Sequence, residues 1–338
     1  MSLTDTPFPD AAAAPSTFAF GGSPPHVERG RIHVSLPLRH AGERAVGVPY
    51  ECVGPADAPV VFVAGGISAD RHVAAHAADD TPGWWDALAG DGRVLDTRRL
   101  RVLAIDWLGS DGTLDVPLDT ADQADAIAAV LDRLGIARLH AFVGASYGAM
   151  VGLQLAARHP SRLGALLAIS GAHRAHPYAA AGRALQRRIV RSGTTPRVAL
   201  SLARQLARLS YRTPEEFAER FPAPAIVADG RVAVAADEYL ESRGALDAVR
   251  LSPVAFVRLT ESIDLHAVDP AAVRVPTTVV AVGEDRLVPS ADLHALAAGL
   301  GATCRLHHLR SRFGHDAFLA EPAPFAAILR EFLCGVPA

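Results

Sequence analysis

A pentapeptide of the form Gly-x-Ser-x-Gly, residues 144–148, constrains this chain more than any other feature. An apolar run, residues 139–143, comes directly before it, and a helix-like stretch, residues 149–156, follows it. A tight turn between a strand and a helix holds its serine in a strained, exposed position, and flanking glycines remove side chains that would clash there. The pattern therefore predicts that Ser146 is a nucleophile. Because so short a motif occurs by chance in glycine-rich chains, the surrounding strand and helix signals carry the prediction.

The composition suits one soluble enzyme domain with an insertion. The 338 residues are 50% hydrophobic, so the chain can bury a large core without disulfides. The net charge of −3 leaves no basic surplus for nucleic acid and no polybasic run for a membrane surface. Three widely spaced cysteines suit reduced thiols in the cytoplasm. Residues 1–30 lack the features of a signal peptide, and we expect a disordered tail there.

Strand and helix signals alternate after this tail. Helical spacing of apolar residues predicts a helix over residues 119–134, stopped by Gly135. A closing helix is predicted over residues 323–333. Short apolar runs predict strands at residues 60–64, 100–106, 163–170, 277–282 and 303–309. Repeated strand–helix units indicate the α/β class, with a mostly parallel central sheet flanked by helices and an active site at the strands' carboxyl ends.

Residues 173–264 interrupt this alternation. They contain arginine-rich amphipathic helices and no convincing strand. We therefore expect a helical lid inserted between two parts of the core, residues 31–172 and 265–338.

A serine nucleophile needs a histidine base and an acid that orients the base. In α/β enzymes with this turn, the chain order is serine, then Asp or Glu, then histidine. Asp285 follows the strand predicted at residues 277–282, and His315 lies in a loop after the last predicted strand. We expect them to form a triad with Ser146, with the adjacent Glu284 as the alternative acid. Asp264 and His266 are a rival pair, for which we expect a structural role at the edge of the insertion.

Acyl transfer through a serine ester also needs two N–H donors for the oxyanion. One is the backbone N–H of Tyr147, the residue after the nucleophile, and the other comes from a loop after an earlier strand. The glycine-rich loop at residues 65–67 follows the strand predicted at residues 60–64, so we expect Gly66 to supply the second donor.

Several stretches resemble the homoserine O-acyltransferases of methionine biosynthesis, an α/β-hydrolase family that moves an acyl group from CoA to the homoserine hydroxyl. The matching stretches are Pro-Gly-Trp-Trp-Asp at 82–86, Leu-Asp-Thr at 95–97, the serine motif with Met150, and residues 314–319. The resemblance covers about residues 60–333. It implies an α/β-hydrolase fold with a helical lid, acyl-CoA as co-substrate with no bound cofactor, and a homodimer. No feature of the sequence suggests a metal.

The resemblance also implies substrate contacts. Arg204 matches the arginine that holds the amino-acid substrate, and a guanidinium can bind a carboxylate bidentately. Without the resemblance, a solvated helix face shared with Arg208 and Arg212 is the plainer interpretation. Asp316 is expected to contact the homoserine ammonium.

The choice of acyl donor stays open. Members that use succinyl-CoA tend to have arginine two residues after the triad acid, where this chain has Leu287. Leu287 favours acetyl-CoA, while Arg286, one residue earlier, keeps succinyl-CoA possible. Four arginines of the insertion are expected on a solvated helix face, with CoA phosphates as the alternative: Arg183, Arg187, Arg188 and Arg191.

The expected mechanism is ping-pong through an acyl-serine, giving an O-acyl-L-homoserine. Two other functions of the same fold remain: a serine O-acyltransferase of cysteine biosynthesis, or a serine esterase. A non-catalytic binding protein is the third alternative, and the complete set of Ser146, Asp285 and His315 argues against it.

Overall fold

The computed structural model describes residues 26–336. Residues 1–25 of the expected tail lie outside this range. Residues 27–30, which the sequence analysis assigned to the same tail, belong to the first strand, β1 (Val27–Leu38). Strand β1 forms an antiparallel hairpin with β2 (Gly42–Val53). The exposed and partly buried residues of β1 alternate, so this hairpin has no continuous apolar run by which to recognise it.

The central sheet has eight strands in the order β1-β2-β6-β3-β7-β8-β11-β12. Strand β2 pairs antiparallel with β6, and from β6 onward all neighbours are parallel. The parallel strands are β3 (Val60–Ala64), β6 (Arg101–Ile105), β7 (Ala141–Ala145), β8 (Leu166–Ile169), β11 (Thr277–Val282) and β12 (Cys304–Leu309). These include every strand that the sequence predicted, and the mostly parallel sheet confirms the α/β class.

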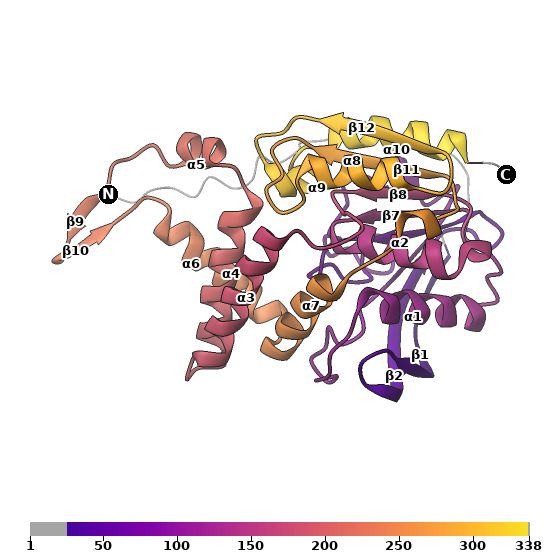
Figure 1. The fold of residues 1–338 in the computed structure, drawn as a ribbon, viewed down its shortest axis with the longest axis horizontal. Coiled ribbons are helices and arrows are strands. Elements are labelled where there is room, and N and C mark those ends of the chain that lie inside the picture. The colour runs from indigo at the N-terminus through magenta and orange to yellow at the C-terminus, as the bar shows by residue number, and fades with distance from the viewer. Residues whose placement is uncertain (1–25, 337–338) are drawn as a thin grey trace.

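Helices cover both faces of this sheet (Figure 1). One core cluster packs the sheet against α1 (Thr120–Arg133), α2 (Tyr147–Arg158) and α8 (Ser290–Gly299), and a second packs it against α10 (Pro322–Gly335). A short helix, α9 (Ala317–Ala320), precedes α10, and two short strands, β4 (Ala89–Gly90) and β5 (Leu95–Asp96), pair beside the main sheet. The capping box of Asp119 begins α1, and Gly135 adopts a left-handed conformation with φ of 66° just after it ends.

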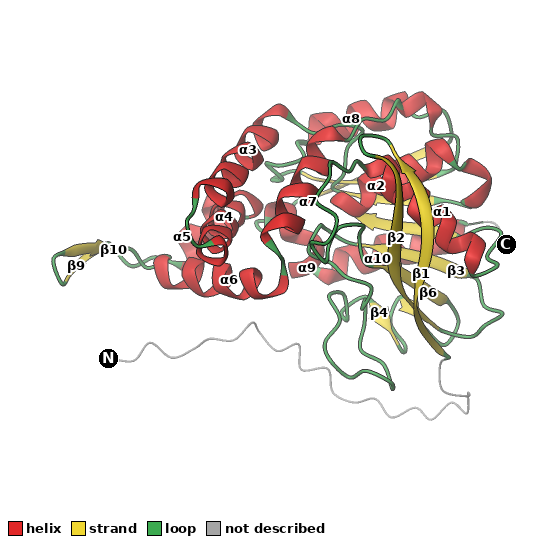
Figure 2. Ribbon diagram, turned by 90° about the horizontal axis from the view of Figure 1, so that it is seen from below, coloured by secondary structure: helices red, strands yellow, loops and turns green. Residues whose placement is uncertain are grey.

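The helices of the insertion gather at one end of the molecule, beyond the sheet (Figures 1 and 2). They are α3 (Pro177–Ser192), α4 (Pro196–Tyr211), α5 (Pro214–Arg220), α6 (Asp237–Arg250) and α7 (Pro253–Leu265), and together we call them the lid. Four of the five begin with proline, which favours the first helical position because its fixed φ suits a helix and no N–H partner is required there.

The sequence predicts no strand in residues 173–264, and this prediction is wrong. A hairpin of β9 (Ile226–Ala228) and β10 (Arg231–Ala233) projects from the lid away from the rest of the molecule (Figure 2). Each strand has only three residues, too few for a period-two pattern to stand out from the neighbouring helices.

None of the helices within residues 26–336 combines the length and apolar character needed to cross a lipid bilayer. Cys52, Cys304 and Cys334 are all free, and burial raises the pKa of the Cys52 thiol to about 11.

Candidate active site

Ser146 occupies the turn between β7 and α2, as predicted. Its φ of 54° and ψ of −116° lie in a region that side-chain-bearing residues rarely adopt, at a cost of about 1–3 kcal/mol. The turn is close-packed on both sides: a Cβ added to Gly144 would lie 2.5 Å from the carbonyl oxygen of Gly148, and one added to Gly148 would lie 2.3 Å from that of Ala64. Ser146 is half-buried, whereas its neighbours in residues 141–150 are buried, so the turn presents this one side chain.

Ser146, His315 and Asp285 form a continuous hydrogen-bonded chain. The Ser146 Oγ lies 2.7 Å from Nε2 of His315, and Nδ1 of His315 lies 2.7 Å from Oδ2 of Asp285. Asp285 follows β11, and His315 lies in the short 3₁₀ turn Gly314–Asp316 after β12. The structure therefore brings together the three residues that the sequence analysis selected, although they are far apart in the chain.

The surroundings of His315 favour the charged form of its imidazole. The Asp285 side chain is fully buried, and its other oxygen, Oδ1, accepts hydrogen bonds from the backbone N–H groups of Leu287 and Val288 at 2.9 and 3.0 Å. Burial alone would lower the pKa of His315, but the adjacent Asp285 carboxylate outweighs burial and raises the pKa above its ordinary value. This arrangement holds the imidazole in the orientation that a general base for Ser146 requires.

The alternative acids and bases lie elsewhere. Glu284 accepts hydrogen bonds from Arg310 and from the backbone of Ser311, not from His315. His266 is buried between the Thr120 hydroxyl and the Ala172 carbonyl oxygen, and burial lowers its pKa to about 4. It therefore has the structural role that the sequence analysis assigned to it.

The glycine loop after β3 lies against the start of α2. The backbone N–H of Gly148 donates to the Gly65 carbonyl oxygen at 2.9 Å, which places residues 65–67 beside the backbone of Tyr147. The indole N–H of Trp107 donates to the Gly66 carbonyl oxygen at 3.0 Å and fixes the orientation of the peptide that follows Gly66. Gly66 and Tyr147 both line the cavity that contains Ser146.

That cavity is about 1580 Å³ in volume and lies between the core and the lid. Core residues that line it include Ser146, Met150 and His315, and lid residues include Arg183, Arg204 and Tyr211. Trp84 also lines the cavity, whereas its neighbour Trp85 is buried and donates its indole N–H to the Phe318 carbonyl oxygen at 3.0 Å. The size suits a substrate much larger than an amino acid.

Arg204 lies within this cavity and is only 4% exposed, so the alternative of a solvated helix face is wrong for it. Its Nε donates to Oδ2 of Asp247 at 2.9 Å, and its Nη1 donates to the Tyr211 hydroxyl at 3.2 Å. Arg208, one helical turn further along α4, donates to the same Asp247 carboxylate. Asp247 on α6 thus fixes two arginines of α4.

The other predicted substrate residues also line the cavity. Asp316 accepts a hydrogen bond from Nε of Arg212 at 2.9 Å, so one of its oxygens already has a cationic partner. Leu287 is half-buried, and Arg286 is exposed.

The prediction that the α3 arginines lie on a solvated helix face is wrong for two of them. Arg183 and Arg187 are largely buried, and each forms an ion pair of 2.7 Å with a different oxygen of Asp264. Arg188 is exposed, as expected, and Arg191 pairs with Glu261. A signal existed in the sequence, because Arg183 lies at helical spacing between Ala179 and Val190, which are both buried on α3.

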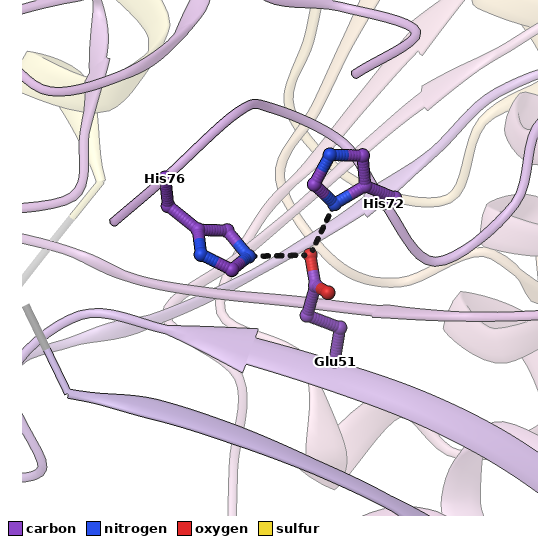
Figure 3. A group of neighbouring side chains, drawn as sticks. All are labelled: Glu51, His72 and His76. Carbon is purple, nitrogen blue, oxygen red and sulfur yellow. Dashed lines mark hydrogen bonds and ion pairs between the residues drawn. The ribbon is translucent and has the colours of Figure 1, made fainter. Parts of the chain in front are cut away.

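Within residues 26–336, one group of side chains could hold a metal ion, although the sequence suggested none. Glu51, His72 and His76 have ligand atoms within 4.8 Å of one another, and both imidazoles approach one Glu51 oxygen (Figure 3). However, Nη2 of Arg29 lies 3.3 Å from Nδ1 of His72 and 3.2 Å from Nε2 of His76, and Arg29 also pairs with Glu51. A guanidinium thus already places positive charge among these atoms, and a metal ion would have to displace it.

Comparisons with known proteins agree with this geometry. A family model for the α/β-hydrolase fold matches residues 59–322. The homoserine O-succinyltransferase of Xanthomonas campestris pv. campestris ATCC 33913 is 59% identical over 97% of this chain and 90% of that protein. The homoserine O-acetyltransferase of Nocardia farcinica is 31% identical over 98% of each chain. The serine O-succinyltransferase of the same Xanthomonas strain is 29% identical over 88% of this chain and 95% of that protein.

Solved structures share the fold at lower identity. The crystal structure of a homoserine O-acetyltransferase from Bacillus anthracis has a TM-score of 0.81 and 18% identity, over 92% of this chain and 99% of that one. The crystal structure of an L374D mutant of esterase E22 has a TM-score of 0.82 and 20% identity, over 91% of this chain and 100% of that one. One backbone architecture therefore serves both acyl transfer and ester hydrolysis.

Proposed function

The chain belongs to the homoserine O-acyltransferases of the α/β-hydrolase fold, and from this we propose that it transfers a succinyl group from succinyl-CoA to the hydroxyl of L-homoserine. The choice of succinyl over acetyl rests on 59% identity to a homoserine O-succinyltransferase, against 31% to the homoserine O-acetyltransferase of Nocardia farcinica. The choice of homoserine over serine rests on a difference between two proteins of one Xanthomonas strain. This chain is 59% identical to the homoserine O-succinyltransferase of that strain and 29% identical to its serine O-succinyltransferase. Both substrates are small molecules, and the product, O-succinyl-L-homoserine, belongs to methionine biosynthesis.

In the first half of the proposed reaction, Ser146 becomes acylated. His315 accepts the proton of the Ser146 hydroxyl as Oγ attacks the thioester carbonyl carbon of succinyl-CoA. The tetrahedral intermediate collapses, the carbon–sulfur bond breaks, and the CoA sulfur leaves with the proton from His315. The hydrogen bond of 2.7 Å between Ser146 and His315 provides the path for that proton.

In the second half, the acyl group passes to homoserine. The homoserine hydroxyl gives its proton to His315 and attacks the acyl-serine carbonyl carbon, and Ser146 leaves and recovers a proton from His315. Backbone N–H groups of Gly66 and Tyr147 stabilise the oxyanion in both halves, each contributing about 10²–10³-fold in rate. The lid covers the cavity and limits the access of water, which would otherwise hydrolyse the acyl-serine.

Homoserine binds, in this proposal, between the lid and the triad. Arg204 uses two nitrogens for Asp247 and Tyr211, and Nη2 is its nitrogen without a hydrogen-bond partner among residues 26–336. That nitrogen is available for the homoserine carboxylate. The free side of the Asp316 carboxylate, next to the base, is available for the homoserine ammonium, which orients the substrate hydroxyl toward Ser146.

We also propose that the protein is a cytoplasmic homodimer. Family resemblance suggests the dimer, and the lid hairpin supports it, because Ile226, Val227 and Val232 are 61%, 76% and 70% exposed. Light scattering on a size-exclusion column would give a mass near 71 kDa for the dimer and 35.5 kDa for a monomer.

The function is tested by free-thiol release from succinyl-CoA or acetyl-CoA, each with L-homoserine, L-serine or no acceptor. We expect release that depends on homoserine and succinyl-CoA and is absent from Ser146→Ala. Release that depends on serine would instead make the protein a serine O-acyltransferase. Release at the same rate without an acceptor would make it a hydrolase.

A further inference from the structure

Two arginines of α3 share a single carboxylate at the wall of the cavity. Arg183 Nε and Arg187 Nη2 each lie 2.7 Å from a different oxygen of Asp264, which is on α7. Arg183 is 9% exposed, and the side chain of Arg187 is 12% exposed. The charges therefore do not balance, because two largely buried guanidinium groups face one carboxylate.

Each of these arginines also has a nitrogen without a partner. Arg183 Nη2 and Arg187 Nη1 are buried and form no hydrogen bond with any other described residue. Buried donors are usually paired, and a buried charge without its full set of hydrogen bonds is costly. The excess positive charge and the unpaired donors both indicate an anionic ligand at this point.

The position of Arg183 identifies where that ligand would sit. Arg183 lines the same cavity as Ser146 and His315, whereas Arg187 does not reach it. The positive charge of Arg183 also acts against the protonation of His315, although more weakly than Asp285 favours it. An anion held by Arg183 would therefore lie in the cavity where substrates react with Ser146.

A second pair of lid arginines, Arg204 and Arg208, helps to identify the anion that Arg183 binds. Arg204 and Arg208 share Asp247 in the same way, one helical turn apart, and Arg204 has the additional hydroxyl of Tyr211 beside it. If that pair binds the homoserine carboxylate, Arg183 is left for a different anion. L-Homoserine has one carboxylate, which this pair would bind. The other carboxylate of the two proposed substrates is the terminal carboxylate of the succinyl group.

We propose that Arg183, held by Asp264, binds the terminal carboxylate of the succinyl group and so selects succinyl-CoA over acetyl-CoA. This inference rests on the proposed function. A succinyl group has a carboxylate two methylenes from the reacting carbonyl, whereas an acetyl group has none and leaves Arg183 without a ligand. Arg286 is the competing residue, but it is exposed and lacks the buried, unpaired donors of Arg183.

The first experiment measures binding without turnover. Isothermal titration gives the affinity of Ser146→Ala for succinyl-CoA and acetyl-CoA, alone and with Arg183→Leu added. A hydrogen bond to a charged group corresponds to about 10- to 150-fold in affinity, and we expect a loss of that size for succinyl-CoA with less than about twofold for acetyl-CoA. Arg188→Leu is the matched control, because it makes the same change at an exposed position of α3. Equal losses for both donors, or no loss, would overturn the proposal.

The second experiment separates the two possible carboxylates. Arg183→Leu in the active protein should lower kcat/KM for succinyl-CoA by a similar factor and leave the KM for homoserine unchanged. A higher homoserine KM with both donors would assign Arg183 to the amino acid and refute the proposal. Arg183→Lys keeps the charge and provides a folded variant, verified by circular dichroism, if the leucine variant does not fold.

Assays of the wild-type protein distinguish a wrong role for Arg183 from a wrong proposed function. A wild-type protein that transfers acetyl but not succinyl would refute the role of Arg183 and retain the acyltransferase. A wild-type protein that transfers neither group would refute the proposed function, and the titrations would still show whether Arg183 recognises a succinyl carboxylate.

Discussion

The core and the lid position their functional side chains by different means. In the core, Ser146 and Asp285 follow the ends of parallel strands, and His315 follows the last strand. Backbone topology thus determines where these groups meet. In the lid, Arg183 and Arg204 are fixed by ion pairs with Asp264 and Asp247. Side-chain pairing, which changes with single substitutions, determines the geometry there.

The residues that carry out acyl transfer and the residues that select the substrate therefore lie in different regions of the molecule. The triad and the glycine loop at residues 65–67 suit any acyl transfer through a serine ester, and the same backbone fold occurs in an esterase. Arg183 and Arg204 of the lid form no hydrogen bond with the triad, but they line the cavity where substrates would bind. Variants of the core should therefore affect every substrate alike, and variants of the lid should discriminate among substrates.

The largest effect is expected from Ser146→Ala, which removes the nucleophile. Activity should fall by about 10⁴-fold or more with every acyl donor and acceptor. Labelling with a fluorophosphonate should disappear as well. Ser170→Ala is the control, because Ser170 also follows a strand with a positive φ, of 49°, and lies outside the triad. Persistent labelling of the Ser146 variant would contradict the assignment of the nucleophile.

A smaller loss is expected from Asp285→Asn, which removes the charge that orients His315. By analogy with other triads, kcat should fall by about 10⁴-fold at most, again for all substrates. Glu284→Gln, one residue earlier, should change kcat by less than about twofold, because Glu284 pairs with Arg310 outside the triad. Similar losses in the two variants, measured by steady-state kinetics, would mean that the acid is misassigned.

Arg204→Leu tests selectivity on the side of the acceptor. Loss of a hydrogen-bonded ion pair with the homoserine carboxylate should raise the KM for homoserine by about 10- to 150-fold. Acylation of Ser146 by succinyl-CoA alone, followed by mass spectrometry, should be unaffected. An equal defect in acylation would place Arg204 in the donor site or in the structure of the lid.

The smallest expected effect concerns pH and connects the two regions. His315 must be neutral to act as a base, and its pKa is raised above 6.5 by Asp285, so kcat/KM should rise with pH through a value above 6.5. Below that pKa the rate should fall about tenfold per pH unit. Because the charge of Arg183 lowers the pKa of His315, Arg183→Leu should move this limb to higher pH, and Arg188→Leu should not. A pH profile that is unchanged by Arg183→Leu would indicate that the lid and the base are electrostatically independent.

The sequence predicted the core better than the lid for a physical reason. Buried parallel strands are continuous apolar runs, so β3, β7 and β11 were recognisable, and Asp285 could be placed from the strand before it. The apolar residues of β1 alternate with polar ones, so a search for continuous apolar runs does not find the hairpin β1–β2. The strands β9 and β10 are too short for any pattern.

Lid residues were harder to place because arginine on an amphipathic helix usually faces solvent. The burial of Arg183 and Arg187 depends on Asp264, which lies about 80 residues further along the chain on another helix. No periodicity within α3 reveals that partner. The proposed role of Arg204 depends on a family resemblance, and the structure adds its partners, Asp247 and Tyr211.

The lid is one uninterrupted segment of the chain, from α3 at Pro177 to the end of α7 at Leu265, inserted between two strands that pair with each other, β8 and β11. Its coding sequence is therefore a single block. One recombination event between related genes could exchange every lid residue that lines the cavity and leave the codons of all three triad residues in place. In the evolution of such enzymes, new substrate preferences can thus be inherited as a unit.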